Sequence, residues 1–145
     1  VFNASNCGNN CARWILEIAK KQDVTSFLTA IGPRCRGVYM VNAKQDTCRY
    51  IYVPPYFKAL LESNRHAFMS SVREYCRELV HPEYHDEFAK LLDYSYIEEQ
   101  IAAHGSLKMT YQIRDGSRVH LKITMADRSS ADVHELLWIF LDETQ

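Results

Sequence analysis

Two histidines four residues apart, His81 and His85, have the spacing of metal ligands on one face of a helix. Pro82 directly follows the first of them, and the start of a helix explains this context better than a ligand does. The sequence contains no His-Glu-x-x-His or Cys-x-x-Cys string, and Cys7 and Cys11 have no matching second pair. We therefore predict no metal site.

A nucleophilic thiol is the second kind of chemistry to consider. The five cysteines are Cys7, Cys11, Cys35, Cys48 and Cys76. Their odd number and loose spacing favour reduced thiols in a cytoplasmic protein over a secreted disulfide framework. Cys48 or Cys76 could pair with a histidine, but no known nucleophile motif surrounds either one. Each is better interpreted as a small buried hydrophobic residue, and we predict no catalytic residue.

The charges of the chain are almost balanced. There are 17 Lys and Arg residues against 18 Asp and Glu residues, which gives a formal net charge of −1. The basic residues are scattered, so we expect no nucleic-acid binding. No stretch approaches the roughly 20 apolar residues that span a bilayer, and the N-terminus lacks a signal-peptide pattern. We therefore expect a cytoplasmic protein. The chain begins with Val1 rather than Met, which is compatible with an excised piece of a longer protein.

The N-terminal part of the chain predicts two helices. In residues 11–22, Trp14, Ile15 and Ile18 fall on one face, and a second amphipathic stretch follows directly. Such helices can pack on their own domain, and they can also form a homodimer or carry a signal. We assign residues 1–33 to a helical extension. If the extension forms a homodimer, we expect the contacts to be Trp14, Ile15 and Ile18.

A strand-like pattern dominates the rest of the chain except for its middle. Pro54 ends the second strand, because proline cannot donate to a sheet ladder, and Asp115 with Gly116 predicts a hairpin turn. The predicted strands are 38–41, 48–53, 107–113, 119–125 and 133–141.

Residues 56–104 predict a block of four short helices between the second and third strands. The third helix begins at Pro82, and a capping box of Ser95 and Glu98 opens the fourth. The fold class is therefore α+β, with a five-stranded antiparallel sheet and a helical block. The last strand is apolar at every position, which predicts cover on both faces, by this block and by the N-terminal helices.

This order of elements, together with four local strings, resembles the PAS fold. The strings are Leu79–Phe88, with its Val-His-Pro-Glu segment, Tyr111–Gly116 with its Asp-Gly turn, Leu141–Thr144 at the end of the last strand, and Val38–Asn42 in the first. Together they cover roughly residues 36–144, within a domain that we place at residues 34–145.

The resemblance implies a regulatory module without catalysis of its own. PAS domains sit beside effectors such as histidine kinases and GGDEF-type cyclic-di-GMP cyclases, and this chain looks most like modules upstream of GGDEF domains. Signal output is then expected through Asp142 and Thr144. The Asn-Cys-Arg-Phe string of flavin-binding relatives is absent, and no residue specifically supports haem, so the sequence requires no cofactor.

The resemblance also implies a ligand pocket between the sheet and the helical block. Arg114, His120 and Lys122 could anchor an anion there if they point inward. Its candidate walls are aromatic and Met residues, although such residues in strands usually just fill a core. The candidate wall residues are Tyr39, Tyr52, Phe57, Met109, Tyr111, Met125 and Trp138.

A small α+β enzyme or a stand-alone ligand-binding protein is the alternative. An enzyme needs a carboxylate or histidine with a perturbed pKa in its pocket. Glu135 is the acid that could point inward from a strand, since Asp115 lies in a turn and Asp142 at the domain exit.

Overall fold

A computed structural model describes residues 34–126 and 135–143. The predicted helical extension, with its dimer contacts Trp14, Ile15 and Ile18, lies outside the described residues, as does Thr144. The division of the chain at residue 33 therefore stays a prediction.

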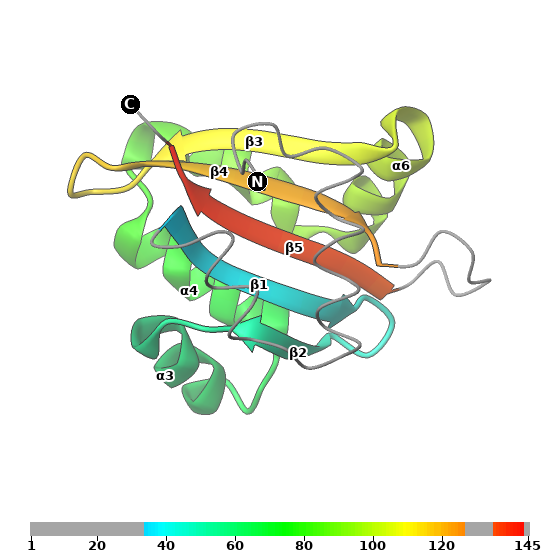
Figure 1. Ribbon diagram of the computed structural model, residues 1–145, viewed down its shortest axis with the longest axis horizontal. Helices are drawn as coiled ribbons and strands as arrows, with labels where there is room; N and C mark the ends of the chain where they lie inside the picture. The colour runs from blue at the N-terminus through cyan, green and yellow to red at the C-terminus, as the bar shows by residue number, and fades with distance from the viewer. Residues whose placement is uncertain (1–33, 127–134, 144–145) are drawn as a thin grey trace, which may run out of the picture.

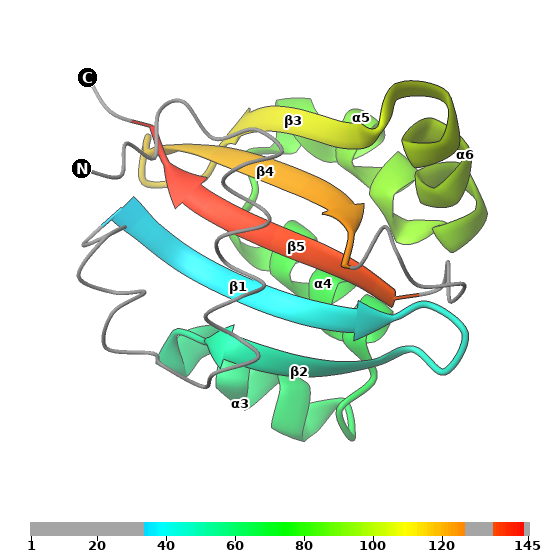
Figure 2. The same cartoon turned by 45° about the vertical axis from the view of Figure 1, so that its right-hand side comes forward.

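The described residues form one five-stranded sheet (Figure 1). Its strands pair in the order β2-β1-β5-β4-β3, and every pairing is antiparallel. The first and last strands therefore lie side by side in the interior of the sheet, as Figure 2 shows. The strands are β1 (Cys35–Asn42), β2 (Thr47–Tyr52), β3 (Ser106–Gln112), β4 (Arg118–Met125) and β5 (Glu135–Asp142).

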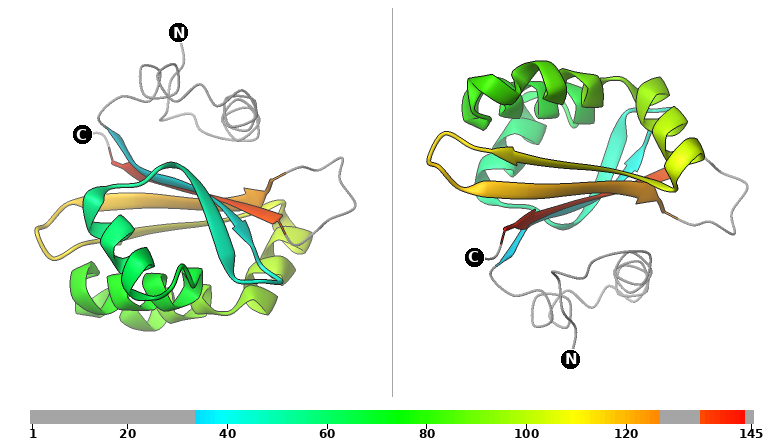
Figure 3. Two further views of the ribbon diagram at one scale, coloured as in Figure 1. Left: turned by 90° about the horizontal axis from the view of Figure 1, so that it is seen from below. Right: turned by 90° about the horizontal axis from the view of Figure 1, so that it is seen from above.

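Four α-helices follow β2 and precede β3, and they cover one face of the sheet (Figure 3). Short 3-10 helices precede and follow α5. The α+β prediction, with a helical block between the second and third strands, is confirmed at this level. The helices are α3 (Pro55–Ser63), α4 (Phe68–Leu79), α5 (His85–Ala89) and α6 (Tyr94–His104).

Local sequence signals explain most of these boundaries. Pro55 occupies the first turn of α3, where its missing N–H costs nothing. Gly116 adopts a φ of 95° in the β3–β4 turn, as the Asp-Gly pair predicts. The predicted capping box was wrong, however, because Asp93 is the N-cap of α6. Its carboxylate accepts a hydrogen bond from the N–H of Ser95, which leaves Ser95 inside the helix.

The helix-side core is the cluster of buried side chains between the sheet and the helices, and its largest fully buried members are Trp138, Tyr111, Phe68 and Phe88. Burial of each such side chain contributes about 1.5–3 kcal/mol to stability. Along β5, Leu136, Trp138 and Phe140 belong to this core, whereas the residues between them are buried on the opposite face. The predicted burial of β5 on both faces is thus confirmed. The predicted packing of the N-terminal helices lies outside the described residues.

Candidate functional site

A pocket of about 360 Å³ opens between the β1–β2 hairpin and helices α3 and α4, where β1 begins and β5 ends. Its walls are mainly aromatic, and they include one arginine and one aspartate. Its volume lies in the range typical of small-molecule sites. The lining residues are Cys35, Arg36, Tyr39, Tyr52, Pro54, Tyr56, Phe57, Tyr75, Leu79, Phe140 and Asp142.

The ring of Tyr39 lies against the backbone of Gly37 and forms the inner wall of the pocket. A Cβ atom at Gly37 would approach the Tyr39 hydroxyl oxygen to 2.6 Å. The ring is held by Phe57 and Phe140, with centroids 5.1 and 5.8 Å away. This arrangement therefore requires glycine at position 37. The Tyr39 hydroxyl makes no hydrogen bond with any described residue, although the residue is only 2% exposed.

A β-bulge in β1 brings Arg36 to the pocket. Cys35 pairs with Leu141 and Gly37 pairs with Phe140, so Arg36 has no partner residue in β5 and is the bulged residue of β1. Without the bulge, strand alternation would place Arg36 on the same face as Val38, away from the helices. Bulges commonly re-aim a side chain in this way beside functional sites.

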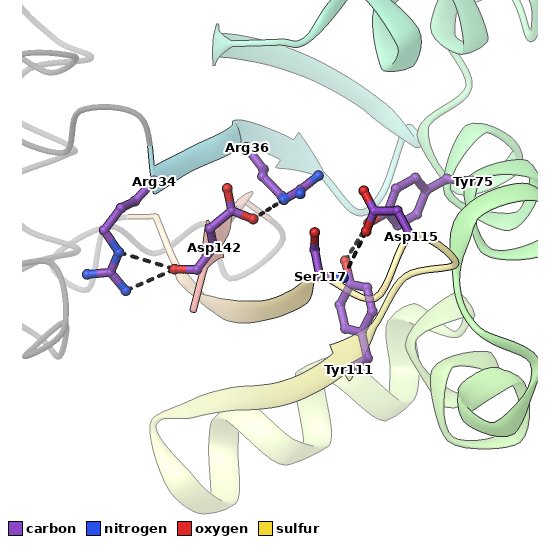
Figure 4. A network of polar contacts seen from close by, with 7 residues as sticks. All are labelled: Arg34, Arg36, Tyr75, Tyr111, Asp115, Ser117 and Asp142. Carbon is purple, nitrogen blue, oxygen red and sulfur yellow. Dashed lines mark hydrogen bonds and ion pairs between the residues drawn. The ribbon is translucent and has the colours of Figure 1, made fainter. Parts of the chain in front are cut away.

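Two arginines from the start of the described chain hold the end of β5 (Figure 4). The Arg36 guanidinium donates through Nε to the Asp142 carboxylate. Arg34 donates from Nε and Nη2 to the Asp142 carbonyl oxygen, at 3.2 and 2.9 Å. Burial lowers the pKa of Arg36, but the hydrogen bond and charge of Asp142 outweigh this effect, so its pKa is raised. Arg36 therefore stays charged at the pocket wall.

Behind the pocket, the hydroxyls of Tyr75 and Tyr111 share a hydrogen bond of 2.7 Å. Burial raises the pKa of Tyr75 to about 12, and it raises the pKa of Tyr111 well above its ordinary value. Both phenols are therefore neutral near pH 7, and the pair offers no base to the pocket.

The thiols of the described chain are unsuited to nucleophilic catalysis. Burial raises the pKa of Cys35, which lines the pocket, to about 12. It also raises the pKa of Cys48 to about 11, and it raises the pKa of Cys76. A nucleophilic thiolate needs the opposite shift. Neither Cys48 nor Cys76 makes a hydrogen bond to a described histidine.

Three of the predicted wall residues, Tyr39, Tyr52 and Phe57, line this pocket. Tyr111 reaches it only through Tyr75. The remaining three lie elsewhere. Met109 and Trp138 are buried in the helix-side core, and Met125 borders a separate hollow beside α6. The indole Nε1 of Trp138 has no hydrogen-bond partner within the described ranges.

The predicted anion anchors do not point into the pocket. Val119 and Leu121 belong to the helix-side core, so the alternating His120 and Lys122 of β4 lie on the opposite face. His120 instead bonds Thr110 Oγ1 at 2.7 Å. Arg114 follows β3 and donates to the carbonyl of Arg77. The basic group at the pocket is Arg36, which was not predicted from the sequence. A local signal was Gly37 beside it, since a glycine inside a strand often marks a bulge.

The residues considered for metal binding and for acid–base catalysis have structural partners. His81 caps the following 3-10 helix through Nδ1, and His85 Nε2 bonds the Val80 carbonyl at 2.8 Å. No group of three or more potential metal ligands occurs in residues 34–126 and 135–143. Glu135 lies outside the pocket and pairs with Arg49 at 3.2 Å. It therefore gives the enzyme alternative no support.

Comparison with known proteins adds one match. Residues 1–46 match a family model described as a domain of unknown function (DUF4869), which covers less than half of the chain. No curated protein matches the chain. No solved structure matches it either. The described helices include none that is long and apolar enough to cross a membrane.

Proposed function

We propose that residues 34–145 form a PAS-type sensor domain that binds a small molecule and regulates a linked signalling effector. The resemblance favours a GGDEF-type cyclic-di-GMP cyclase as this effector. The order of elements and the four strings in residues 38–144 support the family. The aromatic pocket between sheet and helices supports ligand binding.

One observation carries the link between binding and output. Asp142 lines the pocket and is also the last residue of β5. Of the two arginines that contact it, Arg36 lies at the start of β1 and Arg34 directly precedes this strand. Occupancy of the pocket can therefore alter the contact that ties the end of the domain to its beginning. This position agrees with the output role that the resemblance implies for Asp142.

The test uses the complete gene product rather than this segment. We expect the reading frame to encode a signalling effector, and Asp142→Asn to change its output several-fold, measured as cyclic-di-GMP synthesis for a GGDEF effector. Asp86→Asn is the matched control, because Asp86 is exposed on α5 and remote from the pocket lining. A protein without an effector, or an output unaffected by Asp142→Asn, would contradict the proposal.

A further inference from the structure

Arg36 and Tyr39 offer the pocket hydrogen-bond donors that no described residue engages, and Asp142 Oδ2 is an acceptor that no described residue engages. The terminal amino groups of Arg36 make no hydrogen bond with the described residues, since only Nε is engaged. The Tyr39 hydroxyl is likewise without a partner, and its burial raises its pKa, so it keeps its proton. A ligand that satisfies both groups must present an acceptor. A carboxylate is a strong acceptor for a guanidinium, because it can bind two of its N–H groups at once.

The charges at the Arg36 end of the pocket also favour an anion, although the exposed carboxylate of Glu78 binds the hydroxyl of the lining residue Tyr56. Arg34 and Arg36 carry two positive charges beside the single negative charge of Asp142. Asp115 acts on Arg36 from a distance, but it is exposed and its charge is screened by solvent. One carboxylate would therefore balance the charge of this cluster.

The remaining walls define the body of the ligand. Six aromatic side chains line the pocket: Tyr39, Tyr52, Tyr56, Phe57, Tyr75 and Phe140. Aromatic rings pack against one another with a preference beyond simple area burial. A ring-bearing ligand fits such walls better than an extended polar one.

We propose that this pocket binds a small aromatic carboxylate, whose carboxylate is held by the Arg36 guanidinium and the Tyr39 hydroxyl. The inference rests on the proposed function, which makes the pocket the ligand site of the domain. Because the ligand and Asp142 then share one guanidinium, binding weakens the Arg36–Asp142 ion pair. Ligand binding thereby changes the contacts of Asp142 at the end of β5.

Matched pairs of probes test the charge preference. Phenylacetate, 3-phenylpropionate and indole-3-acetate are titrated beside their carboxamides, which keep the ring and remove the charge. Binding is followed by chemical-shift changes in two-dimensional NMR spectra of the folded protein. We expect at least one carboxylate to shift the resonances of Gly37, Tyr39 and Tyr75, and to bind about tenfold more tightly than its amide, as a charge-assisted contact should.

Three variants and one control test whether the proposed residues cause this preference. Arg36→Gln should abolish it, whereas Arg49→Gln should not, because Arg49 is exposed on β2 and outside the pocket. Asp142→Asn should strengthen carboxylate binding, since it removes the competing anion, an effect that a merely structural role of Arg36 would not produce. Gly37→Ala should weaken all probes, because its Cβ displaces the Tyr39 ring.

The binding data can overturn the carboxylate assignment in three ways. Equal binding of acids and amides would overturn the carboxylate assignment while leaving a ligand pocket and the proposed function intact. No pocket shift with any carboxylate at millimolar concentration would also overturn it. If Arg36→Gln fails to fold, judged by its spectrum, weaker or unchanged carboxylate binding in Asp142→Asn overturns the inference on its own. The proposed function is tested separately through effector output.

Discussion

The hydroxyls of Tyr75 and Tyr111 meet at 2.7 Å between α4 and β3, and their surroundings differ. Tyr111 is fully buried in the helix-side core, whereas Tyr75 borders the pocket. A hydrogen bond between two such groups adds little net stability, but a buried hydroxyl that loses its partner costs about 1–3 kcal/mol. The pair is therefore sensitive to the loss of one member.

Single and double substitutions should reveal this asymmetry. We expect Tyr75→Phe to lower the free energy of unfolding by about 1–3 kcal/mol, because it leaves the buried Tyr111 hydroxyl unpaired. Tyr111→Phe should cost less, since the remaining Tyr75 hydroxyl can turn toward the pocket. The double variant should cost less than the sum of the two. Urea denaturation measures all three, and strictly additive losses would refute the account.

At the scale of elements, Asp46 joins three separate parts of the fold. It lies in the β1–β2 turn with a φ of 56°. Its Oδ1 accepts hydrogen bonds from the N–H of Met69, in the first turn of α4, and from the Tyr94 hydroxyl at the start of α6. The N-cap residue of α4, Ala67, has no side chain that can cap. A distant aspartate thus supplies the cap that the helix itself lacks.

Removal of this carboxylate should cost more than removal of an ordinary cap. We expect Asp46→Ala to destabilise the protein by about 2–3 kcal/mol, because two hydrogen bonds are lost and alanine resists a positive φ. Asp46→Asn should cost less, since its amide oxygen can still accept and asparagine tolerates this φ.

The matched control is Asp93→Ala, which removes the local N-cap of α6 at a cost of about 1 kcal/mol. Thermal and urea denaturation compare the variants. If Asp46→Ala were no more destabilising than Asp93→Ala, the bridging role of Asp46 would be disproved.

For the whole molecule, burial of phenols and thiols sets the response to alkaline pH. Burial raises the pKa values of Tyr39, Tyr94 and Tyr111, it raises that of Tyr75 to about 12, and it also raises that of Cys35 to about 12. An unfolded tyrosine releases its proton near pH 10 and an unfolded cysteine at about 8.5. The unfolded chain therefore loses protons at a lower pH than the folded one.

Stability should consequently fall as the pH rises. The contribution of these groups is fully present below their unfolded pKa values and is lost as the pH rises toward their folded values. For Tyr75 alone, the interval from about 10 to about 12 corresponds to roughly 3 kcal/mol. Urea denaturation from about pH 8 to about pH 11 should show a steady loss of stability. The Tyr75→Phe/Tyr111→Phe variant should show a shallower loss, and a flat profile in the native protein would contradict the prediction.

The amino-acid sequence alone determined the elements of this fold. Apolar periodicity, the Pro54-Pro55 stop and the Asp115-Gly116 turn are local signals, because they arise from the backbone preferences of neighbouring residues. They correctly predicted the five strands, the position of the helical block and the burial of β5. They also identified Tyr39, Tyr52 and Phe57 as residues of the candidate pocket.

Only the tertiary structure decided which polar groups meet at the pocket. Arg36 reaches Asp142, 106 positions later in the chain, because β1 and β5 pair and a bulge turns Arg36 toward the helices. The register of β4 with β3 and β5 directs His120 and Lys122 to the other face, where they cannot anchor a ligand in the pocket. Register, bulges and the packing of distant elements depend on the whole sheet, so no short window of sequence is enough to fix them.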